Sequence, residues 1–285
     1  MLTRQPPRVG EGEPRPLDLT ALEPRRGDTG IELPDPHGRG RVRRSYVLCS
    51  TPRSGSTLLS EAIADVGGLG NPLEYFDPTD VMAQLVRRWR CSSIAAYVDA
   101  LHRHGVGPEG VFGARLHWFH LGDLTATYHR GTVPDAGLAL GVVRRVCPES
   151  RFVHVTRRDR DRQAVSWSNA LQTDCWTSRE QGDDAPDPVY DADLIDHCRR
   201  RIDAEDQWWR RLFARAGVRP LTVVYEDLTA RYPEVVASVA RWLGVDVAPA
   251  DVVPPRLRRQ ADERSEEMVA RYRAERGPRS ADYGR

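Results

Sequence analysis

The sequence predicts an α/β fold in which helices cover both faces of a central parallel sheet. Apolar runs at 46–49, 151–156 and 221–225 have the composition of buried strands, and a segment with helical spacing of apolar residues follows each. Strands that alternate with helices along a chain favour a parallel sheet. The 285 residues are 40% hydrophobic and include seven Trp, which suffices for a sizeable core. We expect one large domain.

The first strand and the first helix are the clearest elements. Tyr46-Val47-Leu48-Cys49 is a short apolar run that a turn with Pro and Gly ends, and Ser56–Val66 has apolar residues at helical spacing before it stops at Gly67. Further helices are expected at 80–89, 92–104, 117–128, 159 to about 171, 192–216, 232–243 and 265–275, with a short strand at 111–114 and a lid or insertion at 178–188.

Residues 1–44 differ in composition from the rest of the chain. They contain seven Pro and six Gly among many charges, with no apolar periodicity. Such a segment buries too little apolar surface to offset the entropy lost on ordering. We therefore expect a disordered or loosely docked N-terminal arm over 1–44 and a single folded domain over 45–285.

Charge and hydropathy exclude several classes of function. Lys and Arg number 42 and Asp and Glu 41, so the net field favours neither nucleic acid nor an anionic membrane as a partner. No stretch approaches the ~20 apolar residues of a membrane span, and the N-terminus has no apolar core of a secretory signal. These features favour a cytoplasmic protein.

Cysteine and histidine spacing gives no sign of a disulfide framework or a metal site. The five Cys are widely spaced without a C-x-x-C pair, so we expect them reduced and buried. Two histidine pairs, His102 with His104 and His117 with His120, lack the H-E-x-x-H form and an acidic cluster. We therefore expect no metal.

A polar turn between the first strand and the first helix is the strongest local signal. Such a turn aims unpaired backbone N–H groups and the positive end of the helix dipole at one point, which suits a phosphate. Its glycine allows close approach, its hydroxyls add donors, and its arginine adds a fixed charge. The predicted anion-binding loop comprises Arg53, Ser54, Gly55, Ser56 and Thr57.

This loop does not match the common phosphate-transfer motifs. A Walker A sequence would require Gly at Ser50 and Lys at Ser56, and a cysteinyl phosphatase loop would require Arg where Gly55 follows Cys49. Alternatives nevertheless remain open: a nucleotide-dependent, kinase-like phosphotransferase, a non-catalytic nucleotide-binding protein of the same fold, and a plain strand–helix connection with a helix cap.

A second polar segment, 157–166, follows the strand at 151–156. Here the chain resembles the PAPS-dependent sulfotransferases, in which a strand-terminal Arg and a Ser eight residues later bind the 3′-phosphate of 3′-phosphoadenosine 5′-phosphosulfate (PAPS). Arg158 and Ser166 have this spacing. An Arg at the mouth of a sheet and a Ser on the next helix can converge on one phosphate. The two motifs together match a ligand with phosphates at its 5′ and 3′ positions.

Six segments in order, 54–59, 70–76, 158–166, 172–176, 225–228 and 260–273, resemble the bacterial trehalose 2-sulfotransferase-like family. The resemblance implies a three-layer, P-loop-like sulfotransferase fold over 45–285. It also implies PAPS as donor, adenosine 3′,5′-bisphosphate as product, no metal, and a hydroxyl or amine acceptor on a small molecule such as a sugar or natural product. The acceptor and the oligomeric state stay open, although the resemblance suggests a homodimer.

The resemblance places a catalytic carboxylate at Glu74, which would take the proton of the acceptor as general base. Tyr75 and Phe76 beside it are expected to form an apolar wall that raises its pKa and packs the acceptor. His117 or His120 is the alternative base. Arg53, where many relatives have Lys, would stabilise charge on the departing 5′-phosphate. The 225–228 segment is read as structural hydrogen bonding, and the Trp residues as core or pocket lining.

Overall fold

The computed structural model describes residues 14–24, 32–35, 40–107, 109–129, 135–180, 186–258 and 260–277. These residues fall into two compact units. The sheet unit comprises the described parts of Gly10–Arg158 and Glu205–Pro255, and the helical unit those of Asp159–Ala204 and Arg256–Arg285. The predicted boundary between an arm at 1–44 and a domain at 45–285 stays a prediction.

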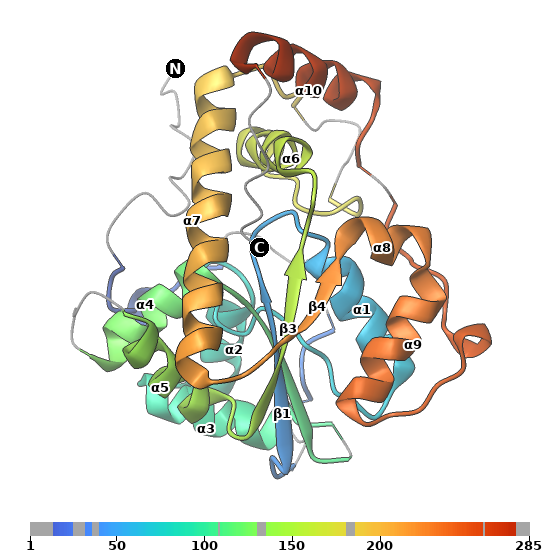
Figure 1. The fold of residues 1–285 in the computed structure, drawn as a ribbon. Coiled ribbons are helices and arrows are strands. Elements are labelled where there is room, and N and C mark those ends of the chain that lie inside the picture. Colours follow the sequence, from blue (N-terminus) through green and yellow to red (C-terminus); the bar gives the residue numbers. More distant parts are fainter. Residues whose placement is uncertain are drawn as a thin grey trace. The chain divides into compact units, whose positions relative to one another are not determined.

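The sheet unit contains a parallel sheet with strand order β2-β1-β3-β4 (Figure 1). In the register of the sheet, Ser50 at the end of β1 lies opposite His117 on β2 and Val155 on β3. The carboxyl ends of the strands therefore meet at one edge, where ligands of such sheets bind. The strands are β1 (Arg44–Ser50), β2 (Val111–His117), β3 (Ser150–Thr156) and β4 (Leu221–Val224).

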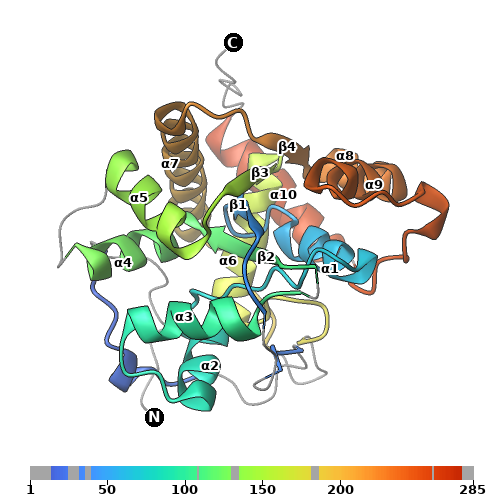
Figure 2. The same cartoon turned by 90° about the horizontal axis from the view of Figure 1, so that it is seen from below.

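Helices cover both faces of this sheet, which confirms the predicted three-layer α/β fold (Figures 1 and 2). On β1, Tyr46 and Leu48 pack in one apolar cluster with α1, α8 and α9, while Val47 and Cys49 pack in another with α2 to α5 and the second half of α7. Successive side chains of a strand point to opposite faces of the sheet, so alternate residues of β1 pack in different clusters. The helices of the unit are α1 (Ser56–Val66), α2 (Val81–Trp89), α3 (Ile94–His104), α4 (Trp118–Tyr128), α5 (Ala136–Val146), α8 (Tyr225–Ala230) and α9 (Tyr232–Leu243), with the short η2 (Pro249–Asp251).

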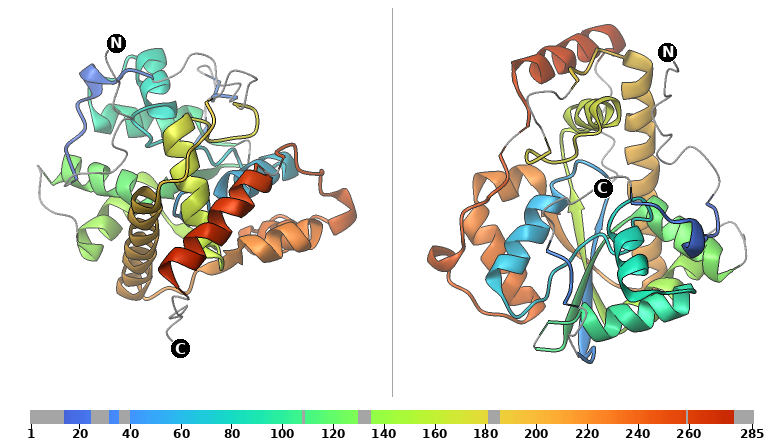
Figure 3. Two further views of the ribbon diagram at one scale, coloured as in Figure 1. Left: turned by 90° about the horizontal axis from the view of Figure 1, so that it is seen from above. Right: turned by 180° about the vertical axis from the view of Figure 1, so that it is seen from behind.

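The helical unit has its own core. It contains α6 (Arg160–Thr173), the first half of α7 (Ala192–Ala216) and α10 (Glu263–Arg276), with α6 and α10 side by side (Figure 3). Trp167 and Tyr272 are fully buried there, and the Tyr272 hydroxyl donates to Asp196 at 2.5 Å. Carboxylate N-caps begin two of the helices, Asp159 for α6 and Asp262 for α10.

Part of the N-terminal segment contacts α4 within the sheet unit. The backbone N–H of Leu17 donates to Thr127 Oγ1 at 2.8 Å, and Leu19 in the short η1 (Leu19–Ala21) is 8% exposed within the core. These contacts concern 14–24 only, because 1–13, 25–31 and 36–39 lie outside the described residues. The middle of the predicted insertion at 178–188 lies outside them as well.

Candidate active site

The predicted anion-binding loop joins β1 to α1 at the carboxyl edge of the sheet. Arg53 and Gly55 both have positive φ, 62° and 88°. A Cβ on Gly55 would lie 2.5 Å from Cδ2 of Tyr225, so the Tyr225 ring packs directly on the loop backbone. Only glycine suits this position, and a non-glycine residue such as Arg53 at positive φ is a form of strain that concentrates at functional sites.

The loop has the donors that an anion requires. Gly55 is the N-cap of α1, and no side chain caps this helix. The Ser54 side chain is fully buried, and its Oγ has no hydrogen-bond partner among the described residues. A buried hydroxyl without a partner is costly unless a ligand or water completes it. Together with the uncapped start of α1, it fits a bound phosphate group.

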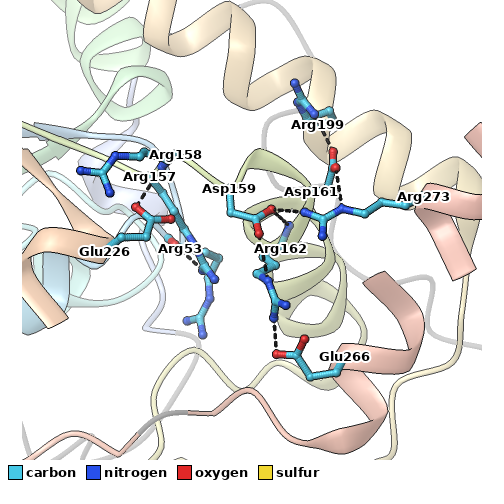
Figure 4. Close-up of polar contacts among 10 residues, drawn as sticks. All are labelled: Arg53, Arg157, Arg158, Asp159, Asp161, Arg162, Arg199, Glu226, Glu266 and Arg273. Atoms are coloured by element: carbon cyan, nitrogen blue, oxygen red, sulfur yellow. Dashed lines mark hydrogen bonds and ion pairs between the residues drawn. The ribbon is translucent and has the colours of Figure 1, made fainter. Parts of the chain in front are cut away.

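The segment after β3 contacts this loop through Arg157. Arg157 Nη1 donates to the Arg53 carbonyl at 3.4 Å (Figure 4). The Arg157 guanidinium also lies 4.6 Å from the centroid of the Tyr225 ring. The Arg158 backbone N–H donates to Glu226 Oε2 at 3.0 Å, and its guanidinium pairs with Asp227. Glu226 and Asp227 thus hydrogen-bond to the segment after β3, in agreement with the structural hydrogen bonding expected of 225–228.

Ser166, the predicted partner of Arg158, lies on α6 in the helical unit. The start of α6 carries an ion-pair cluster within that unit: Arg273 bonds both Asp159 and Asp161, and Arg199 also bonds Asp161 (Figure 4). This cluster joins α6 to α7 and α10. Binding of one phosphate by Arg158 and Ser166 stays a prediction.

Glu74 is held beside the loop by backbone and hydroxyl contacts. The Arg115 N–H on β2 donates to the Leu73 carbonyl at 2.9 Å, and the Ser60 hydroxyl on α1 donates to the Pro72 carbonyl at 2.6 Å. The segment 72–74 is thereby attached to the end of the sheet and to the first helix. The position of the carboxylate therefore does not depend on its own side-chain contacts alone.

The Glu74 carboxylate has two cationic or polar partners. Oε1 lies 2.6 Å from His117 Nε2, and Oε2 lies 3.3 Å from Arg115 Nη2. The other terminal nitrogen of Arg115 donates to the Thr57 hydroxyl in the anion-binding loop. The side chains of Glu74 and Arg115 are only 18% and 12% exposed. One guanidinium thus connects the candidate base to the candidate phosphate site.

The pKa of Glu74 is held well below its usual range. Burial raises this pKa, but the charges of Arg115, His117 and His120, with the His117 hydrogen bond, outweigh burial. The expectation that Tyr75 and Phe76 raise the pKa and wall the acceptor is therefore wrong. Both rings are buried, with Tyr75 stacked on Phe112 at 5.6 Å, so they pack in the core and not in a pocket.

The two alternative bases differ in their surroundings. Both ring nitrogens of His117 have partners, Glu74 on one side and Ser50 on the other, where Nδ1 lies 3.1 Å from the hydroxyl. His120 is buried, with Nε2 3.7 Å from Asp77 Oδ1, and burial lowers its pKa despite the nearby carboxylates. His117 is therefore a partner of Glu74 in this arrangement.

Comparison with known proteins identifies the family. Residues 45–275 match the Stf0 sulphotransferase family. The chain belongs to this family. It is 33% identical to the trehalose 2-sulfotransferase of Mycobacterium tuberculosis strain Erdman over 82% of this chain and 96% of that protein. It is also 33% identical to the trehalose 2-sulfotransferase of Mycolicibacterium smegmatis, over 80% of this chain and 94% of the relative.

Among solved structures, the sulfotransferase domain of the Synechococcus PCC 7002 olefin synthase aligns with 13% identity and a TM-score of 0.44, covering 87% of this chain and 94% of that chain. Membership of the Stf0 family makes the protein a sulfotransferase, as the sequence motifs predicted. Sulfotransferases transfer a sulfuryl group, so family membership argues against the alternative of a kinase-like phosphotransferase.

Sequence reasoning missed Arg115 at this candidate site, and it placed Ser50 at the start of the polar turn without foreseeing its contact with His117. Arg115 is a charged residue inside an apolar strand, with His117 two positions later on the same face. That pattern was a usable signal, because a charge in a buried strand needs a partner. The contact of Ser50 with His117 depends on the pairing of β1 with β2, which the sequence does not reveal.

Other predictions about the Stf0 chain concern cysteines, metals and tryptophans. All five Cys are free, and four are buried while Cys175 is half-buried. Within the described ranges, no group of three or more His, Cys, Asp or Glu could hold a metal ion, and no helix is long and apolar enough to cross a membrane. Trp118 and Trp209 belong to the core of the sheet unit.

Proposed function

We propose that this Stf0 sulfotransferase transfers the sulfuryl group of PAPS to a hydroxyl or amine of a small acceptor, with Glu74 as the general base. The observation that carries the proposal is the Arg115 bridge. Its guanidinium contacts Glu74 Oε2 at 3.3 Å and the Thr57 hydroxyl on the anion-binding loop. An acceptor held by Glu74 would therefore lie next to a donor phosphate held by the loop, as in-line attack requires.

The proton and charge balance follows from this placement. Glu74, ionised because of its depressed pKa, takes the proton of the acceptor as the acceptor atom bonds to sulfur. The bond between sulfur and the phosphate oxygen breaks, and its electrons remain on the 5′-phosphate of adenosine 3′,5′-bisphosphate. Arg53, the buried Ser54 hydroxyl and the first N–H groups of α1 stabilise that charge.

The 3′-phosphate is assigned to Arg158 and Ser166. Arg158 is 54% exposed and Asp227 38%, so their ion pair is weak, about 0–1 kcal/mol, and a phosphate with more charge can displace the carboxylate. For Ser166 the support is the sequence spacing. The 33% identity to two trehalose 2-sulfotransferases supports a sugar hydroxyl as acceptor. A homodimer is part of the proposal, measurable by light scattering.

The test is a transfer assay with a matched pair of variants. Purified protein with PAPS and a panel of trehalose, amino sugars and phenols should release adenosine 3′,5′-bisphosphate and yield a sulfated product. Glu74→Gln should lower kcat about 10²–10⁴-fold, the usual contribution of a general base, and leave the Kd for the bisphosphate unchanged. Glu109→Gln, an exposed glutamate just before β2, should change neither.

Two outcomes would contradict the proposal. If calorimetry detects no binding of the bisphosphate and no acceptor is sulfated, the donor assignment fails. If Glu74→Gln turns over like the wild type, another group is the base.

A further inference from the structure

A chain of buried hydrogen bonds leads from α7 to Glu74. Trp209 Nε1 donates to the Ser50 carbonyl at 3.0 Å, and Ser50 contacts His117 Nδ1. On the other side of the ring, His117 Nε2 lies 2.6 Å from Glu74 Oε1. Ser50 and Trp209 are fully buried, and His117 is 8% exposed. These four residues belong to the sheet unit.

Ser50 presents two different groups to His117 Nδ1. The hydroxyl oxygen lies 3.1 Å from this nitrogen and the carbonyl oxygen lies 3.3 Å from it. A carbonyl can only accept a hydrogen bond, whereas a hydroxyl can donate or accept. Ser50 can therefore satisfy Nδ1 with or without a hydrogen, which no alanine at this position could do.

The contact between His117 and Glu74 indicates which ring nitrogen of His117 carries the hydrogen. An ionised carboxylate is an acceptor only, and the pKa of Glu74 is depressed, so at neutral pH the 2.6 Å contact requires a hydrogen on His117 Nε2. When His117 is neutral, Nδ1 then has a lone pair and needs a donor. The Ser50 hydroxyl is in place to be that donor.

We propose that Ser50 is a positioning residue that holds neutral His117 as the Nε2–H tautomer, so that His117 donates to Glu74 in both of its charge states. The inference rests on the proposed function of Glu74 as the base. It adds that His117 orients the carboxylate and does not take the acceptor proton, because neither ring nitrogen offers a lone pair to the acceptor.

Other groups around His117 leave this assignment unchanged. Arg115 on β2 also bonds Glu74, which favours the ionised carboxylate. On α4, Phe119 stacks on the His117 ring with centroids 5.5 Å apart, and His120, which faces Asp77, lies 5.8 Å away. Stacking on Phe119 favours the ring plane in which Nδ1 faces Ser50 and Nε2 faces Glu74.

The direct test is the tautomer of His117, read by nitrogen-15 NMR with His117→Gln used to assign the signal. In the wild type at a pH where His117 is neutral, Nε2 should carry the hydrogen and Nδ1 should be bare. In Ser50→Ala the carbonyl remains as the only group of residue 50 that faces Nδ1, so hydrogen on Nδ1 should become populated. Ser50→Thr, which keeps a hydroxyl, should restore the wild-type spectrum.

Turnover gives a second readout. Ser50→Ala should lower kcat by about 3- to 10-fold, as expected for one lost hydrogen bond, with the KM for PAPS unchanged. Ser45→Ala is the matched control, because Ser45 lies at the other end of β1 and its buried hydroxyl donates to the Pro148 carbonyl. This control should leave the His117 spectrum and the pH profile of turnover as in the wild type.

The results separate this inference from the proposed function. Hydrogen on Nδ1 in neutral wild-type His117, or a Ser50→Ala spectrum equal to the wild type, overturns the role of Ser50. Should Ser50→Ala fail to fold, Ser50→Gly takes its place, because it also removes the hydroxyl and keeps the carbonyl. The expected tautomer in a protein that transfers no sulfuryl group would support the role of Ser50 and count against the proposed reaction.

Discussion

Replacing Arg115 with Met tests the ion pair at the centre of the site without relying on any substrate. Arg115 Nη2 lies 3.3 Å from Glu74 Oε2, and both side chains are largely buried. Methionine fills a similar volume but removes the charge and the donors. The substitution leaves Glu74 with His117 as its remaining close partner and leaves the Thr57 hydroxyl without the guanidinium.

The expected cost follows from the geometry. At 3.3 Å the gross Coulomb attraction is about 5 kcal/mol with an effective dielectric constant of ~20. Desolvation cancels much of this, and a charged hydrogen bond contributes about 1.5–3 kcal/mol net. Removing one partner of a buried pair costs ~3–5 kcal/mol, and because His117 still pairs with Glu74 we expect about 3 kcal/mol of lost stability.

The assay is urea unfolding followed by Trp fluorescence, at neutral pH and in acid. Glu74 has a depressed pKa in the folded protein, so its stabilisation is present above the unfolded pKa of about 4.3 and is lost as pH falls through the folded value. The difference between wild type and Arg115→Met should therefore be largest at neutral pH and shrink on acidification. Arg144→Met, at an exposed site on α5, should cost within about 0.5 kcal/mol.

A double-mutant cycle provides the refutation. Arg115→Met and Glu74→Gln should couple by about 2 kcal/mol, because each removes the same contact. Additive costs that do not change with pH would show that the two side chains do not interact, and the bridge between base and loop would have to be abandoned.

Two further predictions concern the anion sites. Arg158→Ala should weaken binding of adenosine 3′,5′-bisphosphate by ~1.5–3 kcal/mol and leave adenosine 5′-phosphate unaffected in calorimetry; equal losses for both nucleotides would contradict the assignment. Gly55→Ala should abolish bisphosphate binding and destabilise the protein by about 1–3 kcal/mol, because the new Cβ meets the Tyr225 ring at 2.5 Å. Gly67→Ala, also at positive φ but with no atom within 4 Å of the added Cβ, should retain binding, and equal binding loss in both variants would exclude the Tyr225 contact as the cause.

Local pattern predicted much of the fold. Apolar spacing located Ser56–Val66, Ala192–Ala216 and Tyr232–Leu243 with their observed bounds, because helical periodicity and terminal glycines are properties of the segment itself. It missed Ala136–Val146, where Gly137 and Gly141 lower helix propensity and tertiary burial supplies the stability. It also missed Tyr225–Ala230, where Tyr225 was expected to end a strand.

The site was predictable only where it is contiguous in sequence. The loop at 53–57 and the carboxylate at 74 were named as candidates from local chemistry and family resemblance, and the structure places both at the carboxyl edge of the sheet. The contacts that decide the electrostatics join distant residues: Arg115 lies opposite Leu48 in the sheet, and His117 lies opposite Ser50. The register between two parallel strands cannot be predicted from the sequence of either strand alone. The direction of the Glu74 pKa therefore came out opposite to the prediction.

The hydrogen bonds that hold the backbone of residues 72–74 bear on how members of this family could diverge. The Leu73 carbonyl accepts from the Arg115 N–H, and the Pro72 carbonyl accepts from the Ser60 hydroxyl. These two bonds hold the segment that carries the Glu74 carboxylate, and neither involves the chain after residue 77. Substitutions of exposed side chains beyond residue 77 should leave these two hydrogen bonds, and with them residues 72–74, in place. If Glu74 is the base, as proposed, acceptor preference could change there without moving the carboxylate.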